Sequence, residues 1–211
     1  MNMDASQSTS REPSHRGQPE SGVTLTEEER KTLRDLARAS IGRSLKRHPL
    51  AKRNRLKVDP NDYPPALREP GAVFVTLNIE GRLRGCIGSL EPRRSLVEDV
   101  AHNARAAAFD DRRFKPVSPR EFPRLDVHVS VLTPLVPLEV KSREELLVIL
   151  RPGRDGLLLE DPPHRSTFLP QVWESLPDPE DFLGELFLKG GLSRDHWSPT
   201  LRFHRYSIEE L

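Results

Sequence analysis

Four segments of the chain carry apolar residues at the three- and four-residue spacing of an amphipathic helix. The first follows Thr26, which has the spacing of a capping box with Glu29, a pair of side chains that satisfies backbone amides where a helix begins. One face of this segment is apolar and consists of Leu33, Leu36, Ala37, Ile41 and Leu45. After residue 45 the pattern gives way to a polar, proline-containing connection that runs to Pro70.

A second capping box, Ser95 with Glu98, opens a helix whose apolar face is built mostly from small residues. That face consists of Leu96, Val97, Val100, Ala101, Ala104, Ala107 and Ala108. Because small side chains permit close approach, this helix is predicted to lie against a sheet. Two shorter helices are predicted, one over residues 142–150 with a Ser-x-x-Glu capping box, and one over residues 178–190 with proline at the first helical position.

Strict alternation of apolar and other residues marks the strands. Residues 72–79 and 83–88 alternate on either side of Glu80-Gly81, which predicts a β-hairpin with its turn at that dipeptide. Alternation then predicts that Arg84 and Cys86 share one face of the second strand, while Leu83 and Ile87 lie on the other.

Further strands are predicted over residues 126–132, over 156–159 and 166–169 as a hairpin around Asp161-Pro162-Pro163, and over 201–208. In the first of these, Val127, Val129 and Val131 are predicted to face inward, and Asp126, His128 and Ser130 outward. Hairpins dominate and helices fall between them irregularly. This order predicts an α+β fold with a mainly antiparallel sheet and flanking helices.

Composition adds limits on size and location. The chain has 211 residues, enough for one well-packed domain or a core with a smaller appendage, and its charge is nearly balanced, with 33 Lys and Arg against 32 Asp and Glu. Residues 1–23 contain almost nothing that could build a core and are predicted to form a disordered tail before a domain at 24–211. One cysteine permits no internal disulfide, and no apolar run suits a bilayer span or a secretory signal, so we expect a cytoplasmic protein without membrane contact.

The segment Leu83-Arg84-Gly85-Cys86-Ile87-Gly88 holds the strongest candidate chemistry. A thiolate is the reactive form of cysteine, and a neighbouring cation such as Arg84 lowers the pKa of the thiol. Gly85 and Gly88 would let a ligand approach the backbone closely, and their amides could bind an anion. The alternative is a buried structural cysteine between glycines that serve close packing.

A nucleophilic cysteine also needs a base, and His128 is the best-placed histidine because its strand is predicted to join the same sheet. A surface or hydrogen-bonded histidine is the plainer interpretation. No metal site is predicted, since one cysteine excludes multi-thiolate zinc and no two histidines have a zincin spacing. The basic stretch from Arg43 to Lys57 lacks aromatic residues for base stacking, so a solvated connection is favoured over nucleic-acid binding.

Two runs, residues 71–77 (GAVFVTL) and 81–90 (GRLRGCIGSL), resemble the signature of the AMMECR domain family. Three later blocks agree with that family in the same order: Asn103-Ala104 with Ala106-Ala107-Ala108-Phe109 and Arg113-Phe114; Val129-Ser130-Val131-Leu132; and Phe168-Leu169-Pro170-Gln171-Val172. The resemblance implies a two-part α+β fold with a larger core and a small subdomain. Two positions depart from the family pattern: Arg112 stands where a proline is expected, and His128 where an acidic residue is more usual, which argues against an inherited catalytic role for His128.

The resemblance also implies partners, because this family is often encoded beside, or fused to, a Memo-type protein that resembles dioxygenases and a radical-SAM protein. A pocket around Arg84, Gly85, Cys86, Gly88 and Asn103 is expected to take a small or anionic ligand. Two functions are then open, an enzyme that uses Cys86 directly in a redox or small-molecule pathway, and a non-catalytic binding or adaptor module. The reaction and any cofactor are unknown at this point.

Overall fold

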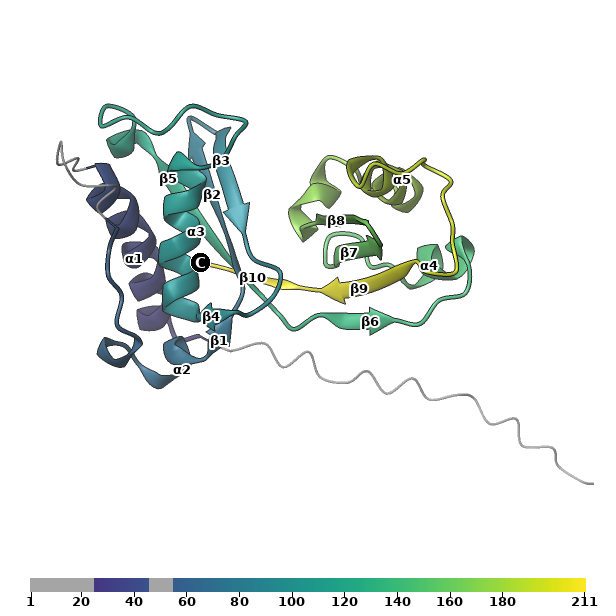
Figure 1. Ribbon diagram of the computed structural model, residues 1–211, viewed down its shortest axis with the longest axis horizontal. Helices are drawn as coiled ribbons and strands as arrows, with labels where there is room; N and C mark the ends of the chain where they lie inside the picture. Colours follow the sequence, from purple (N-terminus) through teal and green to yellow (C-terminus); the bar gives the residue numbers. More distant parts are fainter. Residues whose placement is uncertain (1–24, 46–54) are drawn as a thin grey trace, which may run out of the picture.

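The computed structural model describes residues 25–45 and 55–211, and these form two lobes, each built on one antiparallel sheet. The larger lobe contains the chain up to β5 and the final strand β10, and the smaller lobe lies beside it (Figure 1). This arrangement confirms the predicted α+β class and its larger and smaller parts. The predicted tail, residues 1–23, lies outside the described residues.

The sheet of the larger lobe has the strand order β10–β5–β2–β3. Its strands are β2 (Val73–Ile79), β3 (Arg82–Gly88), β5 (Asp126–Leu132) and β10 (Ile208–Glu210). The hairpin of β2 and β3 turns at Glu80 and Gly81, both with positive φ. Glycine adopts such backbone angles readily, which explains why the turn falls at this dipeptide.

Two helices, α1 (Glu27–Leu45) and α3 (Leu96–Phe109), cover one face of this sheet (Figure 1). Both capping boxes are present, because Glu29 accepts from the Thr26 amide at 2.8 Å and Glu98 accepts from the Ser95 amide at 3.2 Å. The small-residue face of α3 is buried against the sheet and α1, with Ala104 fully inaccessible. Smaller elements complete the lobe: η1 (Pro60–Asp62), α2 (Pro65–Arg68), β1 (Pro70–Gly71) paired with β4 (Arg94–Ser95), and η2 (Phe122–Arg124).

The sheet of the smaller lobe has the order β6–β9–β7–β8. It contains β6 (Val136–Leu138), β7 (Gly156–Asp161), β8 (His164–Phe168) and β9 (Arg202–Tyr206), with α4 (Arg143–Ile149), η3 (Pro170–Glu174) and α5 (Pro179–Lys189). Trp173 and Phe182 stack in its core with ring centroids 3.7 Å apart. Asp178 accepts from two amides of the first turn of α5, and Gly190 ends that helix, as the sequence predicts.

The single strand predicted over residues 201–208 is wrong in one respect, because the structure has two strands that belong to different sheets. Strand β9 pairs with β7 in the smaller lobe, and after Ser207 strand β10 pairs with β5 in the larger lobe. A small apolar cluster at this crossing joins the lobes and contains Ala72, Leu132, Leu158 and Tyr206, with Phe74, Leu90, Leu135, Leu169 and Ile208 beside them. The two lobes therefore share one continuous C-terminal segment.

A register shift in the hairpin corrects the predicted alternation of β3. Leu83 pairs with Asn78 and Gly85 pairs with Leu77, so Arg84 is the extra residue of a β-bulge. Beyond the bulge the alternation is restored, and Cys86 pairs with Thr76. Because Thr76 and Asn78 share one face of β2, Leu83 lies on the same face as Cys86 rather than on the opposite one.

Candidate active site between the two lobes

Three rows of side chains cross the face of the larger sheet that the helices leave uncovered. In an antiparallel sheet, directly paired residues point to the same side. The middle row is Cys86 on β3, Thr76 on β2 and His128 on β5. The rows on either side of it are Leu83–Asn78–Asp126 and Gly88–Phe74–Ser130. We call these nine residues the outer face of the sheet.

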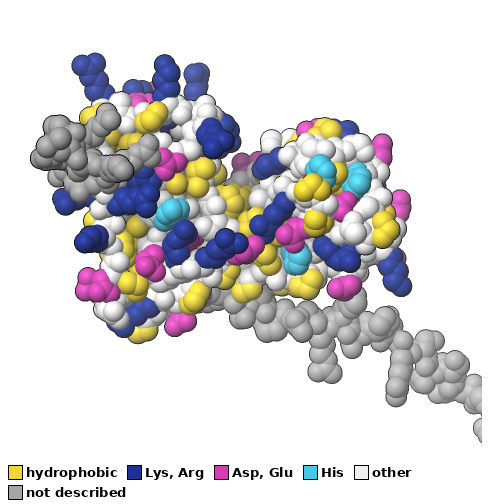
Figure 2. All heavy atoms as spheres, viewed as in Figure 1, with side chains coloured by type: hydrophobic (Ala, Val, Ile, Leu, Met, Phe, Trp, Pro, Cys, Tyr) yellow, Lys and Arg dark blue, Asp and Glu magenta, His cyan; other side chains and the backbone are white. Residues whose placement is uncertain are grey.

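The smaller lobe lies over one end of the outer face. Gln171 of η3 donates to the Ser130 hydroxyl at 3.4 Å and also contacts Glu210 of β10. This cover explains why Ser130, predicted to face outward, is nonetheless only 2% exposed. Figure 2 shows that the surface is hollowed between the lobes, on the side where Figure 1 places β3 and α5. We call this hollow the inter-lobe cleft.

Cys86 is half-buried, and the residues after α3 hold its backbone from the open edge of the sheet. The Asp111 carboxylate accepts from the Cys86 amide at 2.9 Å, and the Arg113 guanidinium donates to the Cys86 carbonyl at 3.3 Å. Arg113 also donates to Asp111 at 2.8 Å. This hydrogen bond, with those from the amides of Cys86 and Arg113, lowers the pKa of Asp111 to about 2 against the opposing effect of burial.

Lys189, at the end of α5 in the smaller lobe, is the second cation near the thiol. Its ammonium donates to the Thr167 carbonyl at 2.8 Å and lies 4.8 Å from the centre of the Phe168 ring. Partial burial lowers the pKa of Lys189, Cys86 raises it, and the Arg113 guanidinium lowers it. Arg113 of the larger lobe and Lys189 of the smaller lobe are therefore the two cations associated with the Cys86 segment.

Arg84, the cation predicted to act on Cys86, has a different partner. Its guanidinium donates to the Glu121 carboxylate at 2.8 Å, in the loop between α3 and β5. That ion pair, followed by hydrogen bonds from Ser118, lowers the pKa of Glu121 to about 2. The guanidinium groups of Arg84 and Arg113 both lie near the Phe114 ring, at 5.9 and 5.5 Å from its centre. Arg84 thus anchors the loop that carries Arg113.

The two glycines of the hexapeptide are positions of close packing. A Cβ atom at Gly85 would lie 2.2 Å from the carbonyl oxygen of Ala107 in α3. A Cβ atom at Gly88 would lie 2.2 Å from the ring of Phe74. The absence of a side chain therefore allows the helix to approach β3 on one face and Phe74 to cross β3 on the other.

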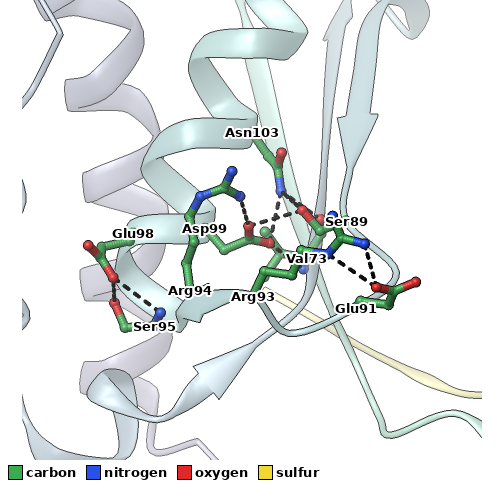
Figure 3. A network of polar contacts seen from close by, with 9 residues as sticks. All are labelled: Val73, Ser89, Glu91, Arg93, Arg94, Ser95, Glu98, Asp99 and Asn103. Carbon is green, nitrogen blue, oxygen red and sulfur yellow. Dashed lines mark hydrogen bonds and ion pairs between the residues drawn. The ribbon is translucent and has the colours of Figure 1, made fainter.

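Asn103, predicted to bind a ligand, lies on the helix-covered side of the sheet and is 2% exposed. Its amide nitrogen donates to the Val73 carbonyl, the Ser89 hydroxyl and the Asp99 carboxylate (Figure 3). Asp99 is fully buried and also accepts from Arg94 at 2.9 Å. This network fixes the turn that follows the hexapeptide, and the structure does not bring Asn103 to the cleft.

His128 lies on the outer face in the same row as Cys86, but Thr76 stands between them. Adjacent strands are about 4.8 Å apart, so the backbones of His128 and Cys86 are separated by about 10 Å. The His128 ring is exposed, and its Nε2 atom pairs with the Asp126 carboxylate at 2.9 Å. The structure therefore gives His128 no direct contact with the thiol.

Sequence reasoning missed three contributors: Thr76, Asp111 and Lys189. Asp111 stands directly before the quoted Arg113-Phe114 block, and its two-residue spacing from Arg113 was an available signal. Lys189 comes from the other lobe, and no local pattern connects it with Cys86.

Within residues 25–45 and 55–211, no three His, Cys, Asp or Glu side chains are grouped so that they could hold a metal ion. Among these same residues, no helix is both long enough and apolar enough to cross a bilayer.

Two lobes, each built on one antiparallel sheet, define the chain as a two-lobed α+β protein, and comparisons with known proteins identify its family. The AMMECR1 family model matches residues 34–211. A Methanothermobacter thermautotrophicus protein is 40% identical over 191 residues, covering 88% of this chain and 94% of its own, and a Thermofilum pendens protein is 40% identical over 201 residues, covering 88% and 90%. The crystal structure of an uncharacterized protein from Pyrococcus horikoshii has a TM-score of 0.78 at 37% identity, covering 88% of this chain and 92% of that one. The chain belongs to the AMMECR1 family.

Proposed function

We propose that the inter-lobe cleft binds a small anionic molecule and presents the Cys86 thiol to it, as an enzyme that uses this thiol would. The proposal is carried by the Arg113 guanidinium of the larger lobe, which donates to the Cys86 carbonyl at 3.3 Å. It is supported by Lys189 of the smaller lobe, whose pKa Cys86 raises. Arginine suits carboxylate and phosphate groups through its planar donors, and lysine adds a mobile point charge. A ligand bridging the two cations would lie against the sulfur and connect the lobes.

The test compares two alkylating reagents that differ in charge, iodoacetate and iodoacetamide. Cys86 is the only cysteine, so alkylation of the native protein reports on this site alone. The ratio of the iodoacetate rate to the iodoacetamide rate should exceed that of an uncharged model thiol, N-acetylcysteine methyl ester, by about three- to tenfold at low salt. Arg113→Gln and Lys189→Gln should each reduce the ratio, because each removes one cation.

Arg112→Gln is the matched control, because Arg112 is an exposed neighbour of Arg113 with the same charge. This variant should leave the ratio unchanged. A ratio equal to that of the model thiol, and insensitive to Arg113→Gln and Lys189→Gln, would refute the proposal.

A binding or adaptor module is the second candidate, and one observation favours it. The polar groups around the hexapeptide are largely engaged within the protein, since Arg84 is held by Glu121 and the Cys86 amide by Asp111. An adaptor needs no activated thiol, so its Cys86 should react with iodoacetamide at neutral pH no faster than the model thiol. An enzyme's thiol should react much faster than the model thiol.

Family membership supports the further proposal that the protein acts with Memo-type and radical-SAM partners in a redox or small-molecule pathway. The proposal places it in the cytoplasm, where reducing conditions keep a free thiol reduced. A pull-down with the tagged chain tests the partners. The wild-type chain and the Lys189→Gln variant are used in parallel to compare the partner proteins that each recovers. Recovery of neither partner class, with the chain folded and expressed, would contradict this part of the proposal.

A further inference from the structure

We propose that Thr76 is the positioning residue for the Cys86 thiol, an inference that rests on the proposed function of the inter-lobe cleft. The Thr76 hydroxyl lies 3.4 Å from the Cys86 sulfur, within hydrogen-bonding range for a sulfur acceptor. The hydroxyl donates to the sulfur, favours its ionised form and holds it on the outer face of the sheet.

The sheet geometry determines this contact. Thr76 and Cys86 are directly paired across β2 and β3, and opposite side chains in such a pair have Cβ atoms about 4.5–5.5 Å apart. Threonine is branched at Cβ, so its side chain has few rotamers and the hydroxyl position is restricted. The Asp111 and Arg113 contacts fix the backbone of Cys86 from the other side. Both members of the pair are therefore held before any ligand binds.

The charged surroundings explain why a hydroxyl can act here without a general base. Arg113 donates to the Cys86 carbonyl, and the Asp111 carboxylate accepts from the Cys86 amide. Lys189 of the smaller lobe is the second nearby cation, since Cys86 raises its pKa. His128 lies one strand beyond Thr76, with its ring paired to Asp126. Thr76 thus lies between Cys86 and His128. A catalytic cysteine–histidine pair needs direct contact, and this placement prevents it. In the proposed arrangement, the hydrogen bond donated by Thr76 to the sulfur takes the place of that histidine contact.

The experiment measures the iodoacetamide alkylation rate of Cys86 as a function of pH, from which the midpoint of thiol ionisation is obtained. Thr76→Val removes the hydroxyl while preserving shape and should raise the midpoint by about one pH unit. Thr76→Ser keeps the hydroxyl and should restore the midpoint to near the wild-type value. Asn78→Ala, on the same face of the same strand but in the neighbouring row, is the control and should leave it unchanged.

A Thr76→Val midpoint equal to that of wild type would overturn the inference. A rise in Thr76→Ser as large as that in Thr76→Val would also overturn it, because the serine keeps the hydroxyl. Thermal melting checks that each variant folds, and Thr76→Ala serves if Thr76→Val does not. The reagent-charge ratio is measured on the same samples. A wild-type ratio like that of the model thiol rejects the anionic ligand while leaving the Thr76 effect measurable, and a high ratio with no Thr76 effect rejects only the positioning role.

Discussion

Gly85 is the point where the hexapeptide and helix α3 are closest, and replacing it tests how the hairpin is placed. In Gly85→Ala the new Cβ would lie 2.2 Å from the Ala107 carbonyl oxygen and 3.1 Å from its carbon. Ordinary contact begins near 3.5 Å, so one of the two elements must move by about 1 Å. Both atoms belong to the helix backbone, which cannot rotate away as a side chain can.

The movement would open the contact between β3 and α3 and loosen the alanines packed behind it. We expect Gly85→Ala to lower the free energy of unfolding by about 3 kcal/mol or more, at the upper end of overpacking costs. In a domain of this size that loss corresponds to a fall in Tm of about 6–12 °C. Urea unfolding followed by circular dichroism measures the first quantity and a thermal scan the second.

Gly88→Ala is the matched comparison, because its new Cβ would also meet an atom at 2.2 Å, but that atom belongs to the Phe74 side chain. A side chain can change rotamer, so the loss should be smaller than in Gly85→Ala. Arg82→Ala, exposed on the same strand, should change the stability by less than about 0.5 kcal/mol. A Gly85→Ala protein as stable as wild type would show that α3 does not press on β3 as the structure has it.

Two further predictions concern packing and acid stability. Ala104 is fully buried in the small-residue face of α3, so Ala104→Leu should overpack that contact and cost about 1–3 kcal/mol in urea unfolding, and an unchanged midpoint would contradict the placement of the helix. Asp111 has a pKa lowered to about 2 in the folded state, so its contribution is complete above its unfolded pKa of 3.8 and is lost as the pH falls through about 2. The stability difference between wild type and Asp111→Asn should therefore be largest near pH 6, at about 1–2 kcal/mol, and shrink below pH 4; a constant difference across that range would refute the assignment.

Local patterns in the sequence were sufficient for most elements of the fold. The capping boxes at Thr26 and Ser95 involve residues three positions apart, so the chain forms them wherever the helix lies. The alternation of residues 73–79 and the Glu80-Gly81 turn likewise depend on neighbours in the chain. The small-residue face of α3 predicted its burial, because side-chain size and helical spacing can be read directly.

The bulge at Arg84 was decided by the tertiary structure, since a one-residue shift in pairing is invisible to an alternation pattern. The shift moved Leu83 to the face of Cys86, and the ion pair with Glu121 engaged the cation that the sequence associated with the thiol. The division of residues 202–210 between two sheets was equally hidden, because both halves have the same strand character.

The sequence by itself determined that a single cysteine lies in a hairpin strand followed by a helix that packs closely on the sheet. Only the tertiary structure decided what surrounds that cysteine. Thr76 contacts the thiol through strand pairing. Lys189 belongs to the other lobe, more than one hundred positions along the chain, and Cys86 raises its pKa. The physical reason is that hydrogen bonds within helices and turns depend on nearby residues, whereas electrostatic contacts across a cleft depend on how two separately packed sheets are joined.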